Sequence, residues 1–345
     1  MSPTQNSAAI FNSVPKEYPV LNETIITVSN TIDLDNVPLS GGTLVKSVYL
    51  SIDPYLRGRM REPTPQATGN LIIGQPIKNF GIGIVIRSEK DGINPGDLLY
   101  VPGLPFQEYN VLQSEHPCRV VKDEPGIPLS AYTRVLGMPG MTAFYGLELV
   151  GKPVQGETIF ISSGASAVGS LVAQLAKAKG LKVIASVGSD DKVDFLKSIG
   201  VDVGFNYKTQ DIAEVLAKEG PIDIYWDNVG GSTLEAALDA CNADARVVVC
   251  GAISQYNASE PYGIKNTTHI LFKRLTVQGF SVLVSETKYE GQSNNPIKFL
   301  NTLVPLVRSG QIKWSEQVYN GIESVGEAVI AVQTGSNTAK VVIKV

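Results

Sequence analysis

Residues 158–187 carry the pattern that most constrains the fold of this chain. A short apolar run at 158–161 meets a turn of small residues at 162–169, and a helical pattern then continues to residue 179. After a glycine, a second apolar run follows at 182–187. The order strand, tight turn, helix and strand predicts one βαβ unit of a parallel sheet.

The small residues of this turn indicate a nucleotide site. They would allow backbone N–H groups to approach a pyrophosphate at the positive end of the following helix. The usual fingerprint is G-x-G-x-x-G or A-x-x-G-x-x-G. Aligned on Gly169, the chain has Ser163 and Ser166 at the other two positions, with Gly164 between them. We therefore expect a dinucleotide here, with a simple βα turn as the alternative.

The end of the second strand indicates which dinucleotide is bound. An NAD site usually has Asp or Glu there to bind the ribose 2′-OH. Here the strand is followed by Gly188 and Ser189, with Lys192 three residues later. Ser189 and Lys192 could hold a 2′-phosphate by hydrogen bond and charge, and Ser189 could also cap the next helix. The expected cofactor is NADP(H) rather than NAD.

Composition excludes several classes of protein. With 345 residues the chain is long enough for two domains, and its net charge of −4 argues against a nucleic-acid binder. It has no run of 18 apolar residues and no secretory signal, so we expect a cytoplasmic protein without a membrane span. The 3 cysteines and 2 histidines are not spaced as metal ligands, so no metal site is predicted.

The pattern along the chain predicts an α/β fold with two regions. Residues 1–125 contain short Val-, Ile- and Thr-rich runs separated by Pro and Gly, which indicates a β-rich domain. From about 130 to 280, strands and helices alternate, as in a doubly wound parallel sheet. Residues 296–345 show two helical and two strand-like patterns, and the last strand could rejoin the first domain. The apolar segment 275–284 could pair across a two-fold axis, so we expect a homodimer.

Several motifs spread along the chain carry a family resemblance. They are SIDPYLRGRM at 51–60, GMPGMTAFYGL at 137–147, ISSGASAVGS at 161–170, SVGSDDKVDFL at 186–196, FNYK at 205–208, DNVGG at 227–231, CGAISQYN at 250–257 and GSNTAK at 335–340. Together they resemble the zinc-independent branch of the medium-chain dehydrogenase/reductase superfamily. The most similar group comprises leukotriene B4 dehydrogenases, prostaglandin reductases and plant alkenal double-bond reductases.

The resemblance implies a domain arrangement and a reaction. A GroES-like catalytic domain would comprise residues 1–128 and 305–345, with a Rossmann NADP-binding domain, 129–304, inserted in it. The implied reaction is NADPH-dependent reduction of the C=C bond of α,β-unsaturated aldehydes or ketones, by hydride transfer to the β-carbon. Substrate size would depend on loops near 62–69 and 254–266. The alternative functions are a quinone reductase and an NADPH-binding protein without turnover.

The implied chemistry needs a hydrogen-bond donor at the substrate oxygen, where negative charge builds as an enolate. A tyrosine hydroxyl suits this role because it is protonated at pH 7. Tyr256 is the first candidate, with a contact to the cofactor ribose as its alternative role. Tyr55, expected to project into the cleft from the first domain, is the second candidate, and packing beneath the Pro54 turn is its alternative role.

The resemblance assigns further residues to the cofactor. Met138 and Thr142 would lie at the nicotinamide end, and Tyr207 beside the 2′-phosphorylated adenosine. Asn228 and Asn337 would lie near the ribose or the phosphates, although each could be an ordinary turn residue. The full predicted set is Met138, Thr142, Ser163, Gly164, Ala165, Ser166, Val168, Gly169, Gly188, Ser189, Lys192, Tyr207, Asn228, Cys250, Gly251, Ile253, Ser254, Tyr256 and Asn337.

Overall fold

The structure is a computed structural model that describes residues 3–62, 69–282 and 295–345. The chain forms two compact units, one made of the residues up to Arg134 with Glu316–Val345, and the other of Val135–Ser315. The boundaries proposed from the sequence, after residues 128 and 304, lie earlier along the chain than these. Most of the 62–69 loop and the end of the 275–284 segment fall outside the described residues.

The first unit is built on a mostly antiparallel sheet with the strand order β14-β15-β3-β4-β5-β7, and β6 also pairs with β3. The strands are β3 (Thr43–Ser51), β4 (Lys78–Ser88), β5 (Leu98–Pro105), β6 (Tyr109–Leu112), β7 (Arg119–Val121), β14 (Glu316–Asn320) and β15 (Lys340–Lys344). The end of the chain joins this sheet, because Val342 of β15 lies opposite Ser51 of β3 in an antiparallel pair. The predicted return of the last strand to the first domain is confirmed.

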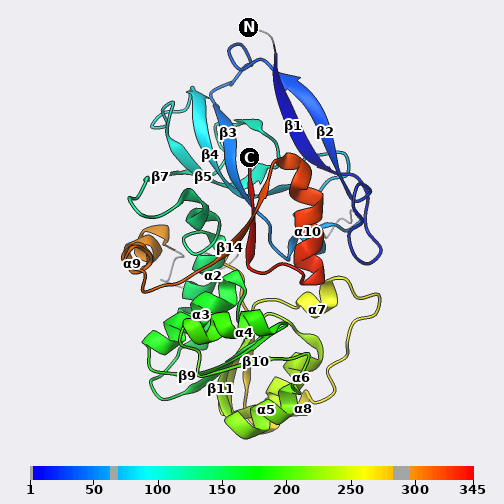
Figure 1. Cartoon of the computed structure of the whole chain (residues 1–345), viewed down its shortest axis with the longest axis vertical. Coiled ribbons are helices and arrows are strands. Elements are labelled where there is room, and N and C mark those ends of the chain that lie inside the picture. Colours follow the sequence, from blue (N-terminus) through cyan, green and yellow to red (C-terminus); the bar gives the residue numbers. More distant parts are fainter. Residues whose placement is uncertain (1–2, 63–68, 283–294) are drawn as a thin grey trace. The chain divides into compact units, whose positions relative to one another are not determined.

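Smaller elements complete the first unit. They are the hairpin β1 (Thr4–Phe11) and β2 (Ile25–Ile32), the helices α1 (Leu56–Arg59) and α10 (Val325–Thr334), and the 3₁₀ turns Leu129–Thr133 and Ile322–Ser324. Figure 1 shows β1 and β2 (blue) as a long hairpin and α10 in red. The core is apolar, with Phe11, Leu50, Leu104, Phe106 and Val329 among its buried side chains.

The second unit contains a parallel sheet with the strand order β10-β9-β8-β11-β12-β13. The strands are β8 (Thr158–Ile161), β9 (Lys182–Val187), β10 (Val203–Asn206), β11 (Ile222–Asp227), β12 (Cys241–Val249) and β13 (Thr276–Gly279). The chain moves outward from β8 to β10, then crosses to β11 and continues to β13. The predicted doubly wound sheet is confirmed, and its order reverses between β8 and β11, where such sheets bind their ligands.

Helices connect the strands of the second unit. They are α2 (Met138–Gly146), which continues into a π-helical turn (Leu147–Gly151), α3 (Ala167–Ala178), α4 (Asp190–Ser198), α5 (Ile212–Glu219), α6 (Gly231–Ala240), α7 (Ile253–Tyr256), α8 (Thr268–Phe272) and α9 (Pro296–Arg308). Figure 1 shows α3 and α4 in green near β9 and β10. In the described part of the chain, none of the helices combines the length and apolar character needed to cross a membrane.

Candidate active site

The turn between β8 and α3 is held against the sheet by two glycines. A methyl group on Gly164 would lie 2.7 Å from the Cβ atom of Ala185, and one on Gly169 would lie 2.5 Å from the carbonyl oxygen of Ser163. Ser163 has a left-handed backbone, with φ of 54°, which is uncommon for a residue with a side chain. The turn therefore brings its backbone close to β9 and to the start of α3, as the fingerprint predicts.

Ser166 caps α3. Its backbone is extended, and its Oγ atom accepts a hydrogen bond of 3.0 Å from the N–H group of Gly169. The N–H groups of Ala167 and Val168 precede the first intrahelical bond and remain available to an anion. A hydroxyl that accepts one hydrogen bond still has its proton to donate, so Ser166 keeps a donor at the helix N-terminus.

We expect Gly169→Ala to weaken this turn. The added methyl group would overlap the Ser163 carbonyl oxygen and lie 3.1 Å from Ser166 Oγ, so the turn must move. The expected loss is about 1–3 kcal/mol in the free energy of unfolding, typical of overpacking, with weaker NADPH binding. Urea unfolding and cofactor titration measure the two effects. Gly263→Ala is the control because a methyl group there meets open space, and equal effects of the two substitutions would contradict this account.

The end of β9 holds groups that suit a phosphate. Ser189 occupies the N-cap position of α4, as the alternative prediction has it, but its side chain makes no capping hydrogen bond. The ring of Tyr207 lies over Gly188, where a methyl group would be 3.3 Å from the Tyr207 hydroxyl oxygen. Asp190, at the start of α4, accepts a hydrogen bond of 2.9 Å from Asn206.

Two lysines add positive charge beside these groups. Lys192 is half-buried, and burial followed by the positive charge of Lys208 lowers its pKa. Within the described residues, neither lysine forms an ion pair. Lys208 was missed in the sequence, although it follows Tyr207 directly in the FNYK motif. These two cations are close enough for the charge of Lys208 to affect Lys192, and together with the uncapped Ser189 hydroxyl they suit the 2′-phosphate of NADP(H).

Tyr256 ends the short helix α7 with its hydroxyl oxygen turned back toward the main chain. The N–H group of Ala252 donates a hydrogen bond of 3.2 Å to this oxygen. Gly251 leaves room for the oxygen, because a methyl group there would lie 3.3 Å from it. Burial raises the pKa of Tyr256, so the phenol is protonated at neutral pH. One lone pair is engaged by Ala252, and no acceptor for the proton of the phenol is found among the described residues, so the phenol can donate this proton to another group.

Asn228 and Ser162 join the ends of β8 and β11. The Asn228 amide donates a hydrogen bond of 2.7 Å to the Ser162 carbonyl oxygen and accepts one of 3.2 Å from the Trp226 indole. The Asn228 N–H group donates to Ser162 Oγ over 3.0 Å. The turn after β11 is closed by Asp227, whose Oδ1 atom accepts from the N–H groups of Val229 and Gly230, whereas the Asn228 amide is engaged by Ser162 and Trp226.

The segment after β12 is tied to the same sheet edge. The Ile253 N–H group donates to the Asn228 carbonyl oxygen over 3.2 Å, and Ser254 Oγ donates to the Val229 carbonyl oxygen over 2.6 Å. Burial raises the pKa of the Cys250 thiol to about 12, so this thiol is neutral. The candidate residues 163–169, 188–192, 207, 228 and 250–256 all follow the carboxyl ends of strands of one sheet.

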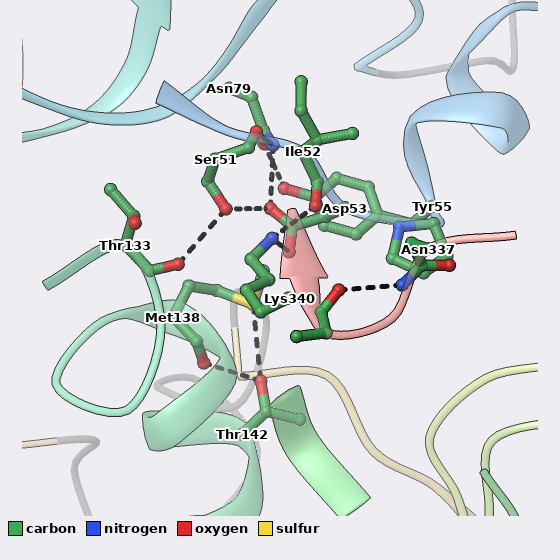
Figure 2. A network of polar contacts seen from close by, with 12 residues as sticks. Ser51, Ile52, Asp53, Tyr55, Asn79, Thr133, Met138, Thr142, Asn337 and Lys340 are labelled. Carbon is green, nitrogen blue, oxygen red and sulfur yellow. Dashed lines mark hydrogen bonds and ion pairs between the residues drawn. The ribbon is translucent and has the colours of Figure 1, made fainter. Parts of the chain in front are cut away.

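Thr142 lies buried on α2 with its hydroxyl engaged inside the helix. It donates to the Met138 carbonyl oxygen over 2.9 Å and also lies 3.4 Å from the Met138 sulfur atom (Figure 2). The alternative of a helix start is confirmed, since Met138 and Pro139 form its first turn. The Thr142 oxygen retains a lone pair.

In the first unit, a buried carboxylate holds a network of polar contacts. Asp53 accepts hydrogen bonds of 2.6 Å from Ser51 Oγ and 2.9 Å from Asn79 Nδ2, and its other oxygen lies 2.7 Å from Lys340 Nζ. Figure 2 shows Asp53 between these partners. The attraction between Asp53 and Lys340, together with the hydrogen bonds to Asp53, offsets the free-energy cost of burying two charged groups.

The other two candidates of the first unit lie beside this network. The Tyr55 hydroxyl donates a hydrogen bond to Asn79 Oδ1. The Asn337 amide donates to the Ala339 carbonyl oxygen over 2.8 Å, in the turn that precedes β15. Asn337 therefore stabilises this turn, which is the alternative role predicted for it. Burial, followed by the charge of Asp53, raises the pKa of Tyr55 well above its usual value.

Across the described ranges, no group of three or more His, Cys, Asp and Glu side chains is arranged to hold a metal ion.

The sequence matches two family models, one described as "N-terminal domain of oxidoreductase" over residues 27–120 and one described as "Zinc-binding dehydrogenase" over residues 167–292.

The chain is also similar to individual proteins over nearly its whole length. It is 37% identical to "2-alkenal reductase (NADP(+)-dependent)" of Nicotiana tabacum, over 99% of this chain and 97% of the relative. It is 40% identical to "NADP-dependent oxidoreductase RED1" of Cochliobolus heterostrophus, over 99% and 98%. Its structure is similar to that of CurA from Vibrio vulnificus in complex with NADPH, with a TM-score of 0.85, 31% identity and 98% of each chain covered.

These similarities identify the protein as an oxidoreductase that binds NADP(H). The chain belongs to the zinc-independent branch of the medium-chain dehydrogenase/reductase superfamily, in the group of alkenal and prostaglandin reductases.

Proposed function

We propose that this protein uses NADPH to reduce the C=C bond of α,β-unsaturated aldehydes and ketones. Relatives with the printed names 2-alkenal reductase, (+)-pulegone reductase and prostaglandin reductase 1 are 34–37% identical to it over 89–99% of the chain. The observation that carries the proposal is the Tyr256 phenol, which is protonated and has its proton free. A neutral phenol can stabilise an enolate oxygen without a metal ion.

The residues of the second unit suit each part of the cofactor. The turn at 163–169 would hold the pyrophosphate on the N-terminus of α3, with Gly164 and Gly169 allowing close approach. Ser189, Lys192 and Lys208 would hold the 2′-phosphate, with the Tyr207 ring beside the adenosine. When bound, NADPH supplies a hydride for the β-carbon of the substrate.

Tyr256 would then act on the substrate oxygen. Its hydroxyl donates a hydrogen bond to the carbonyl oxygen, where negative charge increases during reduction. Because Ala252 holds the phenol oxygen from the other side, little reorganisation is needed as that charge develops. The same bond makes the phenol a better donor, since hydrogen bonds in series polarise one another.

The test is a panel of enals, enones and quinones incubated with purified protein and NADPH. Loss of absorbance at 340 nm, together with a saturated aldehyde or ketone identified by mass spectrometry, is the expected result. Turnover of quinones alone would establish a quinone reductase instead. Tight NADPH binding with no turnover of any member would establish a binding protein, and an allylic alcohol product would mean carbonyl reduction.

We further propose a homodimer formed along β13. Among the described residues this strand lies at the edge of the parallel sheet, and Val277 on it is 40% exposed, so a second copy could extend the sheet from this edge. Val277→Lys should shift the dimer toward monomer by placing like charges near the two-fold axis. Sedimentation velocity at several concentrations measures this shift, and a wild-type monomer at every concentration would contradict the proposal.

A further inference from the structure

A single carboxylate oxygen holds the turn that follows β11. Asp227 Oδ1 accepts a hydrogen bond of 2.7 Å from the Tyr225 hydroxyl. The same atom accepts from the N–H groups of Val229 and Gly230, over 3.0 and 2.8 Å. The Asp227 side chain is fully buried, and its Oδ2 atom has no hydrogen-bond partner among the described residues. The hydrogen bonds of this side chain therefore converge on Oδ1.

The main chain of this turn holds the segment that carries Tyr256. The carbonyl oxygens of residues 227–229 accept hydrogen bonds of 2.9–3.2 Å from the N–H groups of Cys250, Gly251, Ile253 and Ser254. Ala252 lies between these donors, and its N–H group donates instead to the Tyr256 hydroxyl oxygen over 3.2 Å. The turn therefore fixes the residues on both sides of the one that holds the phenol.

The backbone of the turn depends on the carboxylate. Gly230 and Gly231 both have a left-handed backbone, with φ of 69° and 57°. Glycine loses more conformational freedom on folding than other residues, so this arrangement needs other interactions to stabilise it. Asp227 supplies them by binding two consecutive N–H groups of the turn. Without the carboxylate, the buried Gly230 N–H group would lose its acceptor, and the turn would shift.

The turn requires the lone pairs of Asp227 Oδ1 rather than a negative charge. All three donors to this oxygen are neutral groups. Burial raises the pKa of the Asp227 carboxyl, and the hydrogen bonds to it lower this pKa. The amide oxygen of an asparagine has the same two lone pairs. An asparagine amide nitrogen would replace Oδ2, which makes no hydrogen bond within the described part of the chain.

We propose that Asp227 is a positioning residue that fixes the Tyr256 phenol through the main chain of residues 227–229 and 250–254. Its effect on catalysis rests on the proposed function, because only turnover uses the phenol as a donor. Its effect on the position of the 250–256 segment does not, since that is a property of the protein without substrate.

Enone reduction measures the effect on catalysis. Asp227→Ala should lower kcat about 10- to 100-fold, as expected when a catalytic group is displaced by about 1 Å, with little change in the Kd for NADPH. Asp227→Asn should keep kcat within about 3-fold of the wild type, because it keeps the acceptor. Asp223→Ala is the matched control and should leave kcat unchanged. The Asp223 carboxylate also holds main chain, by accepting from the Thr158 N–H group over 2.8 Å, but it lies at the other end of β11.

A double-mutant cycle separates positioning of the phenol from a general structural role. Tyr256→Phe has already lost the hydroxyl group, so adding Asp227→Ala should lower kcat by less than about 3-fold further. A further loss as large as that in the wild-type background would overturn the proposal. A kcat of Asp227→Asn as low as that of Asp227→Ala would also overturn it.

Hydrogen exchange followed by mass spectrometry tests the positioning without turnover. Asp227→Ala should speed exchange in residues 250–256 by about 10-fold, the equivalent of one hydrogen bond to a charged group, and should leave exchange in β10 unchanged. Asp227→Asn should keep the wild-type protection. Unchanged exchange in folded Asp227→Ala would overturn the proposal. If wild type reduces no enone, the proposed function fails, and this exchange alone decides the role of Asp227.

Asp227→Ser replaces Asp227→Ala in both experiments if the alanine variant does not fold. The serine side chain is shorter, and its hydroxyl oxygen can accept from only part of the turn. The kcat and the protection of residues 250–256 should therefore fall below those of Asp227→Asn. Equal values in the serine and asparagine variants would overturn the proposal.

Discussion

Replacing Tyr256 with Phe should lower kcat for enone reduction by about 100-fold or more while leaving NADPH affinity nearly unchanged. The substitution removes the one proton that the structure leaves free on this phenol and keeps the ring. A donor aimed at developing charge acts mainly in the transition state, so the loss appears in kcat. Single-turnover kinetics and cofactor titration separate the two quantities.

Gly251→Ala serves as a second variant for the same claim. Its methyl group would lie 3.3 Å from the Tyr256 oxygen and from the Asn228 carbonyl oxygen, so it would displace the phenol slightly without removing it. We expect a smaller drop in kcat than with Tyr256→Phe. An unchanged kcat in Tyr256→Phe would move the donor role away from this residue.

Replacing Lys192 with Ala should remove most of the preference of the protein for NADPH over NADH. A charged hydrogen bond to phosphate contributes about 1.5–3 kcal/mol, so the Kd for NADPH should rise about 10- to 100-fold. The Kd for NADH should change little, because NADH lacks the 2′-phosphate. The measurement is the ratio of the two affinities by fluorescence titration.

The matched control for Lys192 lies on the same helix. Lys197 of α4 is exposed and pairs with Asp194 over 2.9 Å, so Lys197→Ala should leave the ratio unchanged. Lys208→Ala should lower the ratio as well, because Lys208 is the second cation of the pair. Equal losses for NADPH and NADH in Lys192→Ala would show that Lys192 does not bind the 2′-phosphate.

Local patterns predicted much of the second unit. The strands β8 and β9 were predicted with their observed bounds, because each is a short apolar run next to glycine or small turn residues. The alternation of strands and helices did not give the exact start of α5, which begins at Ile212 because Asp211 caps it by accepting from the Glu214 N–H group over 3.0 Å. Caps of this kind are hard to place in a sequence rich in polar residues.

Long-range pairs explain what the sequence could not predict. The strand β1 has the sequence TQNSAAIF, whose polar and small residues lack the alternation of a typical strand, and it forms by pairing with β2. Lys340 appears in the sequence only as the last residue of the GSNTAK motif, yet it is buried against Asp53, 287 residues earlier in the chain. No spacing rule connects such residues, so the direction of the Tyr55 hydrogen bond was also unpredictable.

The most direct test of the proposed reaction uses NADPH carrying deuterium at the transferable position of C4. Incubation with an enone, followed by NMR of the product, locates the label. The expected product is a saturated ketone with one deuterium on the β-carbon and a solvent-derived hydrogen on the α-carbon. Deuterium on the carbonyl carbon of an alcohol product, or an enone recovered without label while NADPH is consumed, would contradict it.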